Sequence, residues 1–170
     1  AFIPRQYLAV IAVLLAIMMS VLDGTIMNIA LPTLAHDFDV TPSTAIWIVN
    51  AYQLVITMTL LSFASLGDIY GYRRIFLIGI SIFVGASLAC TLSTSFWMLT
   101  AARVIQGFGA ACVMSVNTAL IRLIYPPQIL GRGMGVNAMV VAVSAAAGPS
   151  IAGSILALGS CLLYTSDAAD

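Results

Sequence analysis

The sequence predicts an all-α membrane protein with about five transmembrane helices. Of its 170 residues, 62% are hydrophobic and 7% are charged, whereas soluble domains carry roughly 25% charged residues. Five apolar stretches reach the length of about 20 residues that a helix needs to cross a bilayer. Proline, glycine or charge separates most of these stretches, and helices satisfy their own backbone hydrogen bonds in lipid. This composition excludes a soluble domain.

The first span is expected at about residues 7–31. Its apolar run continues past Asp23 to Leu31 without a small-residue cleavage site, which favours a transmembrane helix over a signal peptide. The other spans are expected at about 45–66, 75–92, 96–124 and 133–158, with breaks at Pro32, Pro42, Gly67-Asp68, Ser93-Thr94-Ser95 and Tyr125-Pro126-Pro127. Residues 1–159 would form one partial bundle. Residues 160–170 are a polar tail, and our hypothesis is that the chain is a fragment whose tail is foreign sequence.

The arginines predict the orientation in the membrane. They precede the first span, separate the second from the third, and separate the fourth from the fifth, and these three places share one side. The residues are Arg5, Arg73, Arg74, Arg122 and Arg132. The opposite side holds His36, Asp37 and Asp39. Because cytoplasmic loops carry the excess of basic residues, we expect a cytoplasmic N-terminus in a plasma membrane, the inner membrane of a bacterium.

Enzymes, metal proteins and nucleic-acid-binding proteins are not expected. The sequence has no carboxylate pair, His/Cys cluster or nucleophile with a neighbouring base, so we expect no catalytic residue, metal or cofactor. Cys90, Cys112 and Cys161 stand singly and are expected to be small core residues. His36 is expected in a solvated loop. No basic cluster marks a nucleic-acid interface.

Asp23 is the one carboxylate inside a predicted span, where a charge costs about 3 kcal/mol or more. It therefore faces a bundle interior or a wet cavity, with a partner. Arg103 lies about seven residues into the fourth span and Asp23 about eight before the outer end of the first, which places both roughly 10–12 Å below the outer surface. Opposite charges at matching depth predict a pair or a shared water network. Desolvation favours the neutral acid and the cation favours the carboxylate, so the site could bind and release a proton.

Polar residues three, four or seven apart share one helix face. Such stripes occur in the first, second, fourth and fifth spans, which we expect to border a polar cavity, with the third span behind them or facing lipid. The stripes are Met19, Asp23, Met27 and Ala30; Asn50, Gln53 and Thr57; Arg103, Gln106, Met114 and Asn117; and Asn137, Ser144 and Gly148. Polar residues also bond helix to helix, the interpretation favoured for Thr57 and Asn137. The expected cavity residues are Met27, Asn50, Gln53, Gln106 and Asn117.

Small residues predict close contacts between helices. Gly107 and Gly109 cluster in the fourth span, and Ser144, Gly148 and Ala152 repeat at spacing four in the fifth. This spacing lets helix backbones approach. Pro149 removes one hydrogen bond within its helix. From the residues alone, dense packing and a hinge or seal are equally good interpretations.

The sequence contains four recognisable motifs, at residues 22–32, 64–74, 103–111 and 144–153. Together they resemble the N-terminal half of a major facilitator superfamily transporter, most closely the fourteen-helix drug:proton antiporters of the multidrug-resistance type. Residues 22–32 (LDGTIMNIALP) resemble the helix-1 signature, with Met27 where valine is commoner. Residues 103–111 (RVIQGFGAA) resemble the helix-4 motif. Residues 144–153 (SAAAGPSIAG) resemble the helix-5 antiporter motif, with Ser144 and Ala152 in place of glycines.

The fourth motif, residues 64–74 (ASLGDIYGYRR), resembles the superfamily's loop between helices 2 and 3. Asp68, Gly71 and Arg73 match it. Departures occur at Ala64, which replaces a glycine, and at Ile69 and Tyr72, which replace basic residues. The resemblance therefore implies that the charge lock of this loop is present but weaker.

The resemblance implies two six-helix bundles, each built of inverted three-helix repeats, that rock around a midplane site. This chain would be part of the N-terminal bundle, with the C-terminal bundle of the same full-length chain as its partner. The implied activity is export of lipophilic, often cationic compounds in exchange for protons, driven by the proton gradient and using no cofactor. Asp23 and Arg103 would couple protons. The gating residues would be Asp68, Gly71, Arg73, Gly107, Gly148 and Pro149.

Two alternatives stay open. One is a transporter of a specific metabolite within the same superfamily. The other is an inactive membrane fragment or scaffold, against which the buried charges argue. The identity of the substrate, and the choice between twelve and fourteen helices, are not predicted.

Overall fold

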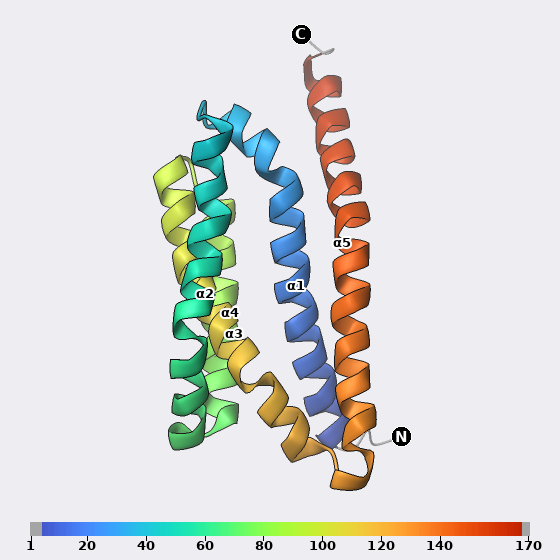
Figure 1. The fold of residues 1–170 in the computed structure, drawn as a ribbon. Helices are drawn as coiled ribbons and strands as arrows, with labels where there is room; N and C mark the ends of the chain where they lie inside the picture. The colour runs from blue at the N-terminus through green and yellow to red at the C-terminus, as the bar shows by residue number, and fades with distance from the viewer. Residues whose placement is uncertain (1–4, 168–170) are drawn as a thin grey trace.

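The structure, a computed structural model, consists of five long α-helices joined by short connections (Figure 1). It describes the backbone of residues 5–167 and the side chains of residues 8–154. The helices are α1 (Arg5–Asp37), α2 (Pro42–Tyr70), α3 (Tyr72–Thr91), α4 (Phe96–Ile124) and α5 (Leu130–Asp167), with a 3-10 turn, η1 (Pro127–Ile129), before α5. Each α-helix contains a stretch long and apolar enough to cross a membrane. The predicted all-α membrane fold with five spans is therefore confirmed.

Several helices extend beyond the predicted spans. α1 runs through Pro32 to Asp37, and the chain turns at Asp39, whose φ is 51°. α5 runs through Pro149 to Asp167. The predictions followed apolar runs, whereas a helix continues beyond the apolar region as long as its backbone hydrogen bonds are made. Residues 160–167 therefore continue α5. Residues 168–170 lie outside the described part, and the foreign origin of the tail stays a prediction.

Side-chain caps begin α2 and α4, and a single glycine separates α2 from α3. The side-chain oxygens of Thr41 and Ser95 each accept a hydrogen bond at 3.3 Å, from the backbone N–H groups of Thr44 and Met98 respectively. Gly71 alone separates α2 from α3 and has a φ of +94°, which residues with a Cβ rarely adopt. These short connections make consecutive helices antiparallel.

The helices pack as two groups. α2 and α3 both lie along α4, and α1 lies along α5, whereas α1 touches α2 and α4 less extensively (Figure 1). We call these the α2–α3–α4 group and the α1–α5 pair. Within the first group, a Cβ at Gly109 would lie 2.6 Å from the backbone N of Phe83. The third span thus packs behind α4, one of the two positions expected for it.

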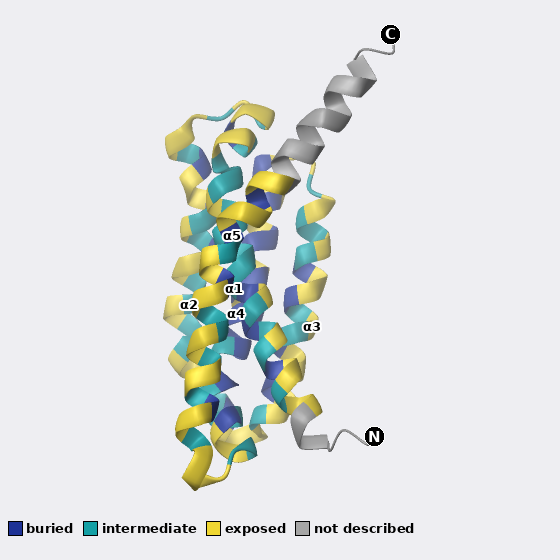
Figure 2. Ribbon diagram, turned by 90° about the vertical axis from the view of Figure 1, so that its right-hand side faces the viewer, coloured by how far each residue is buried: buried dark blue, intermediate teal, exposed yellow. Residues whose placement is uncertain are grey.

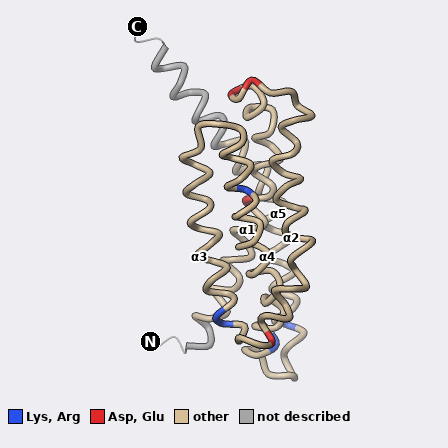
Figure 3. The backbone as a smooth tube through the Cα atoms, turned by 90° about the vertical axis from the view of Figure 1, so that its left-hand side faces the viewer, with Lys and Arg blue, Asp and Glu red and all other residues tan. Residues whose placement is uncertain are grey.

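α4 is the central helix, and it contributes more buried residues than any other helix (Figure 2). In the described part of the chain, charged residues lie at the two ends of the bundle, with one exception in its middle (Figure 3). The start of α3, the end of α4 and the start of α5 carry arginines at one end, and the α1–α2 turn carries Asp37 and Asp39 at the other. The orientation in the membrane stays a prediction. The exception is the pair of Asp23 and Arg103.

Candidate functional site

An ion pair between α1 and α4 lies in the middle of the bundle. Arg103 donates from Nη1 to Oδ2 of Asp23 across 2.7 Å. The side chain of Arg103 is 6% exposed and that of Asp23 is 19% exposed. The predicted pairing of these charges is confirmed. Each charge needs the other, because a buried charge left without its partner is strongly destabilising.

Three further side chains surround the pair. Gln106, also on α4, donates from Nε2 to Oδ1 of Asp23 at 3.2 Å. The thiol of Cys90, on α3, donates to Oε1 of Gln106 at 3.7 Å. The ring of Tyr52, on α2, has its centroid 5.8 Å from the guanidinium carbon of Arg103, within cation–π range. We call these five residues the Asp23 cluster. Four helices build it, and both oxygens of the carboxylate accept hydrogen bonds.

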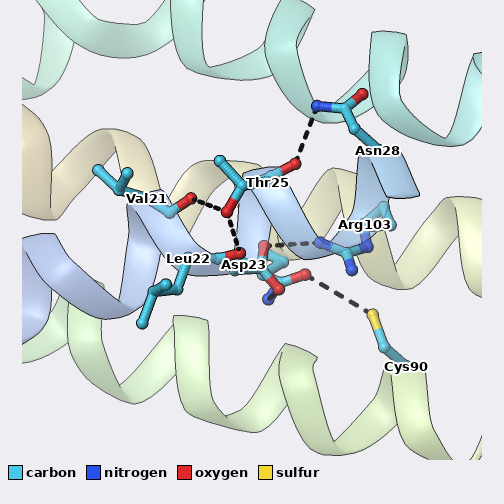
Figure 4. A network of polar contacts seen from close by, with 9 residues as sticks. Val21, Leu22, Asp23, Thr25, Asn28, Cys90 and Arg103 are labelled. Carbon is cyan, nitrogen blue, oxygen red and sulfur yellow. Dashed lines mark hydrogen bonds and ion pairs between the residues drawn. The ribbon is translucent and has the colours of Figure 1, made fainter. Parts of the chain in front are cut away.

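The polar neighbours of Asp23 on α1 bond within their own helix. The hydroxyl of Thr25 donates to the carbonyl of Leu22 at 2.9 Å, and Nδ2 of Asn28 donates to the carbonyl of Gly24 at 3.0 Å (Figure 4). Side chains of this kind commonly bond the preceding turn of their helix. They therefore do not compete with Arg103 and Gln106 for the carboxylate.

A cavity of about 270 Å³ adjoins the cluster between α1, α2 and α4. Its wall combines one cation with hydroxyl, amide and thioether groups. Six of its lining residues are Ser20, Thr25, Met27, Asn28, Gln53 and Arg103. Apolar residues such as Ile48 and Ile56 also line this cavity. Apolar walls with a few placed polar groups are typical of small-molecule sites.

The expected cavity residues divide between several places. Met27 and Gln53 line the cavity. Gln106 is 1% exposed and bonds Asp23 instead. Asn50 lies in a separate groove along α2, with Trp47. No described residue of α5 lines the cavity, because α5 packs along α1. The expectation that the fifth span borders this cavity is not met.

Asn117, also expected in the cavity, bonds α4 to α5. Its Nδ2 donates to Oδ1 of Asn137 at 3.1 Å, and its side chain is buried. The cavity interpretation of Asn117 is therefore corrected, because its position on α4 faces α5. The interpretation of Asn137 as a link between helices is confirmed.

Gly107 and Gly148 lie at contacts with no room for a side chain. A Cβ at Gly148 would lie 2.7 Å from the Cβ of Thr25 on α1, and one at Gly107 would lie 3.0 Å from the carbonyl oxygen of Tyr52 on α2. Both glycines thus bring a helix backbone against a residue that lines the cavity. Pro149 follows Gly148 inside the continuous helix α5. Dense packing is present at both glycines, and their gating role stays a prediction.

The connection between α2 and α3 differs from the charge lock that the resemblance implies. Asp68 accepts a hydrogen bond from the hydroxyl of Tyr72, the residue that replaces a basic one in the motif. Among the described side chains, Arg73 forms no salt bridge with Asp68. Arg73 lies instead beside Phe76 in a groove between α1, α3 and α4. Tyr72 binds the carboxylate because it lies four residues after Asp68, across the turn at Gly71.

Tyr52 and Cys90 belong to the cluster but are not predicted by the sequence. Tyr52 lies four residues from both Ile48 and Ile56, which line the cavity with it, so helical spacing could have found it. Cys90 is expected as a core residue, and its role as a donor depends on where α3 packs against Gln106. In the part of the chain that is described, no group of three His, Cys, Asp or Glu residues could hold a metal.

Known proteins are similar to this chain over most of its length. The model of the Major Facilitator Superfamily matches residues 13–165. An uncharacterized transporter, YebQ of Escherichia coli (strain K12), is 58% identical over 158 residues, or 93% of this chain and 35% of YebQ. The riboflavin transporter RibZ of Clostridioides difficile (strain 630) is 36% identical over 152 residues, or 89% of this chain and 33% of RibZ.

A drug efflux pump, JefA of Mycobacterium tuberculosis (strain ATCC 25618 / H37Rv), is 38% identical over 151 residues, or 88% of this chain and 30% of JefA. The chain spans about a third of the length of these curated relatives.

Proposed function

Because this chain belongs to the Major Facilitator Superfamily, we propose that the full-length protein exports lipophilic or cationic compounds in exchange for protons by alternating access. We further propose that it lies in the plasma membrane, the inner membrane of a bacterium, with its N-terminus in the cytoplasm. Export is supported by JefA, a drug efflux pump, and by a tetracenomycin C resistance and export protein that is 35% identical over 152 residues.

The observation that carries the proposal is the ion pair of Asp23, which is partly buried, and Arg103, which is buried, next to a cavity. A passive scaffold has no need of it, since apolar residues of similar volume often stabilise a protein as well as a buried ion pair does. A carboxylate beside a substrate cavity has two states that differ by one charge. A cation in the cavity favours the carboxylate, and a proton on Asp23 disfavours the cation. Proton and cationic substrate therefore compete, which is what exchange requires.

The cavity walls support the lipophilic part of the proposal. Met27 and Ile48 give it apolar surface, and Gln53 gives it a neutral hydrogen-bonding group. Thioether side chains are flexible and polarizable, so they adapt to ligands of different shape. The C-terminal bundle of the full-length protein would supply the facing wall.

The alternative within the superfamily is a transporter of one specific metabolite. RibZ, whose name states riboflavin transport, is 36% identical over 152 residues, a match as long as that of JefA to within one residue. A specific transporter would recognise one compound, whereas a multidrug exporter would move several unrelated dyes. Competition between unlabelled compounds and a transported dye separates the two.

The test uses the full-length protein in a strain without its own efflux pumps. Dye efflux is measured with and without a proton gradient for the unmodified protein and for Asp23→Asn. We expect the gradient to accelerate efflux by the unmodified protein and to leave Asp23→Asn unaffected, because an amide cannot carry the proton. Asp39→Asn is the matched control, since it removes a carboxylate from the turn after α1. If Asp23→Asn responds to the gradient as the unmodified protein does, Asp23 is not the proton carrier.

Arg103→Ala tests the other half of the pair. We expect it to abolish gradient-driven efflux while membrane insertion, measured by immunoblot of the membrane fraction, is retained. Loss of inserted protein would show that Arg103 acts on folding rather than on transport.

A further inference from the structure

We propose that the side-chain amide of Gln106 turns over when Asp23 is protonated, and that the thiol of Cys90 positions this amide in the orientation that suits the carboxylate. The geometry of the Asp23 cluster carries this inference, and its role in transport rests on the proposed function.

The carboxylate of Asp23 is surrounded by donors. Arg103 donates to Oδ2 at 2.7 Å, and Nε2 of Gln106 donates to Oδ1 at 3.2 Å. An ionised carboxylate only accepts hydrogen bonds, so both contacts are satisfied in this state. The orientation of the Gln106 amide thus matches a deprotonated Asp23.

Protonation brings two donors into opposition. The proton adds to Oδ1, because Oδ2 faces the guanidinium of Arg103, and no covalent bond breaks elsewhere. The new O–H group of Asp23 and the N–H group of Gln106 Nε2 then point their hydrogens at each other, so the hydrogen bond between them is lost. Gln106 is 1% exposed, so its amide has little contact with bulk water and depends on Asp23 and Cys90 for its hydrogen bonds. A half-turn about the terminal torsion of glutamine, which is soft and roughly two-fold, directs Oε1 to the hydroxyl and restores the hydrogen bond.

Cys90 influences which orientation of the Gln106 amide is favoured. A thiol is a weak donor and a weak acceptor, and Cys90 now donates to Oε1 of Gln106 at 3.7 Å. After the turn it meets Nε2 instead, and its donated hydrogen bond is lost. Cys90 therefore favours the orientation that suits the carboxylate. It is a positioning residue that acts on Asp23 through Gln106.

Other charged and titratable groups around Asp23 do not face the Gln106 amide in this way. Arg103 on α4 holds the opposite oxygen, and Tyr52 on α2 lies against the guanidinium. The described side chains of α5 include one charge, that of Arg132 in the first turn of this helix. The Cys90–Gln106 contact is thus the part of the cluster on α3 that senses the state of Asp23.

Infrared difference spectroscopy on the purified full-length protein tests the turn without measuring transport. Lowering the pH should produce the carboxylic-acid band of Asp23, assigned by its absence in Asp23→Asn. The S–H band of Cys90, assigned by its absence in Cys90→Ala, should shift with the same midpoint, because its acceptor leaves. In Asp23→Asn the S–H band should not respond to pH. An S–H band that stays constant while the carboxylic-acid band develops would overturn the proposal.

The positioning role predicts a second result. In Cys90→Ala the carboxylic-acid band should develop at a pH higher by about half a unit, the effect of losing one weak hydrogen bond. Cys90→Ser, which keeps a donor, should return towards the unmodified midpoint. Cys112→Ala is the matched control, since it removes a buried thiol from the same α3–α4 contact away from Gln106. An equal shift in Cys112→Ala, or none in Cys90→Ala, would overturn the role of Cys90.

Transport separates this proposal from the proposed function. If the two bands change together but efflux ignores the gradient, the turn of Gln106 stands and proton-coupled export fails. If both stand, the pH profile of efflux in Cys90→Ala should shift in the same direction as the carboxylic-acid band.

Discussion

Substitution of Gly148 by alanine tests the contact between α1 and α5. The new Cβ would lie 2.7 Å from the Cβ of Thr25, which no change of rotamer can move. The helices must separate by at least about 0.7 Å, because ordinary contact begins at 3.4 Å. Overpacking of this kind costs about 1–3 kcal/mol, and alanine returns about 1 kcal/mol through its higher helix propensity.

Gly135→Ala is the matched control, since Gly135 also lies in α5 and has open space around its Cβ position. Both substitutions gain the same helix propensity, so the difference between them isolates the overpacking. The assay is unfolding of the full-length protein in mixed micelles by increasing SDS, followed by circular dichroism. We expect Gly148→Ala to be less stable than Gly135→Ala by about 1–3 kcal/mol.

Equal stability of the two variants, within about 0.5 kcal/mol, would refute the close contact. A third variant makes the reasoning stricter. Replacing Thr25 by glycine removes the three atoms that lie nearest to the new Cβ. Gly148→Ala should therefore destabilise the protein less in that background than in the unmodified one, and no such rescue would also contradict the geometry.

Three further predictions concern stability in the same unfolding assay. Asn137→Ala leaves Nδ2 of Asn117 buried without its acceptor and should cost about 1–3 kcal/mol, whereas replacing both asparagines by leucine should cost less. Gly71→Ala should cost about 1–3 kcal/mol because its φ is +94°, and Gly71→Asn should cost about as much, because the ψ of 130° lies outside the left-handed helical region that asparagine tolerates. Gly109→Ala should destabilise the α3–α4 contact by about 1–3 kcal/mol, whereas Gly85→Ala on α3, with open space around it, should not.

The fold and the central ion pair could be predicted because each depends on length and depth along a helix. Apolar length predicted five spans, and counting residues from the helix ends placed Asp23 and Arg103 at one level. The direction in which each side chain points could not be predicted as well. It depends on the rotation of each helix about its axis, which packing sets. Asn117 therefore faces α5 rather than the cavity.

Contacts between single side chains were the least predictable part of the site. Cys90 reaches Gln106 because glycines bring α3 and α4 together, and neither residue carries that information alone. At the α2–α3 connection, the hydroxyl of Tyr72 donates a hydrogen bond to Asp68. Arg73 matches the motif, but this match did not predict which residue would bind Asp68. Local spacing explains this contact once the turn is known, but the charge pattern alone favoured another partner.

The ion pair also has a consequence for synthesis of the chain. Asp23 and Arg103 are 80 residues apart, so at about 5–20 residues per second the aspartate waits roughly 4–16 s for its partner to be made. During that time α1 must remain in or near the membrane with an unpaired carboxylate, which favours the protonated acid. Gly148, which packs against Thr25, is made later still. Insertion of α1 is therefore secured only as α4 and α5 arrive, and slower elongation between these helices should lengthen its exposure to quality-control proteases.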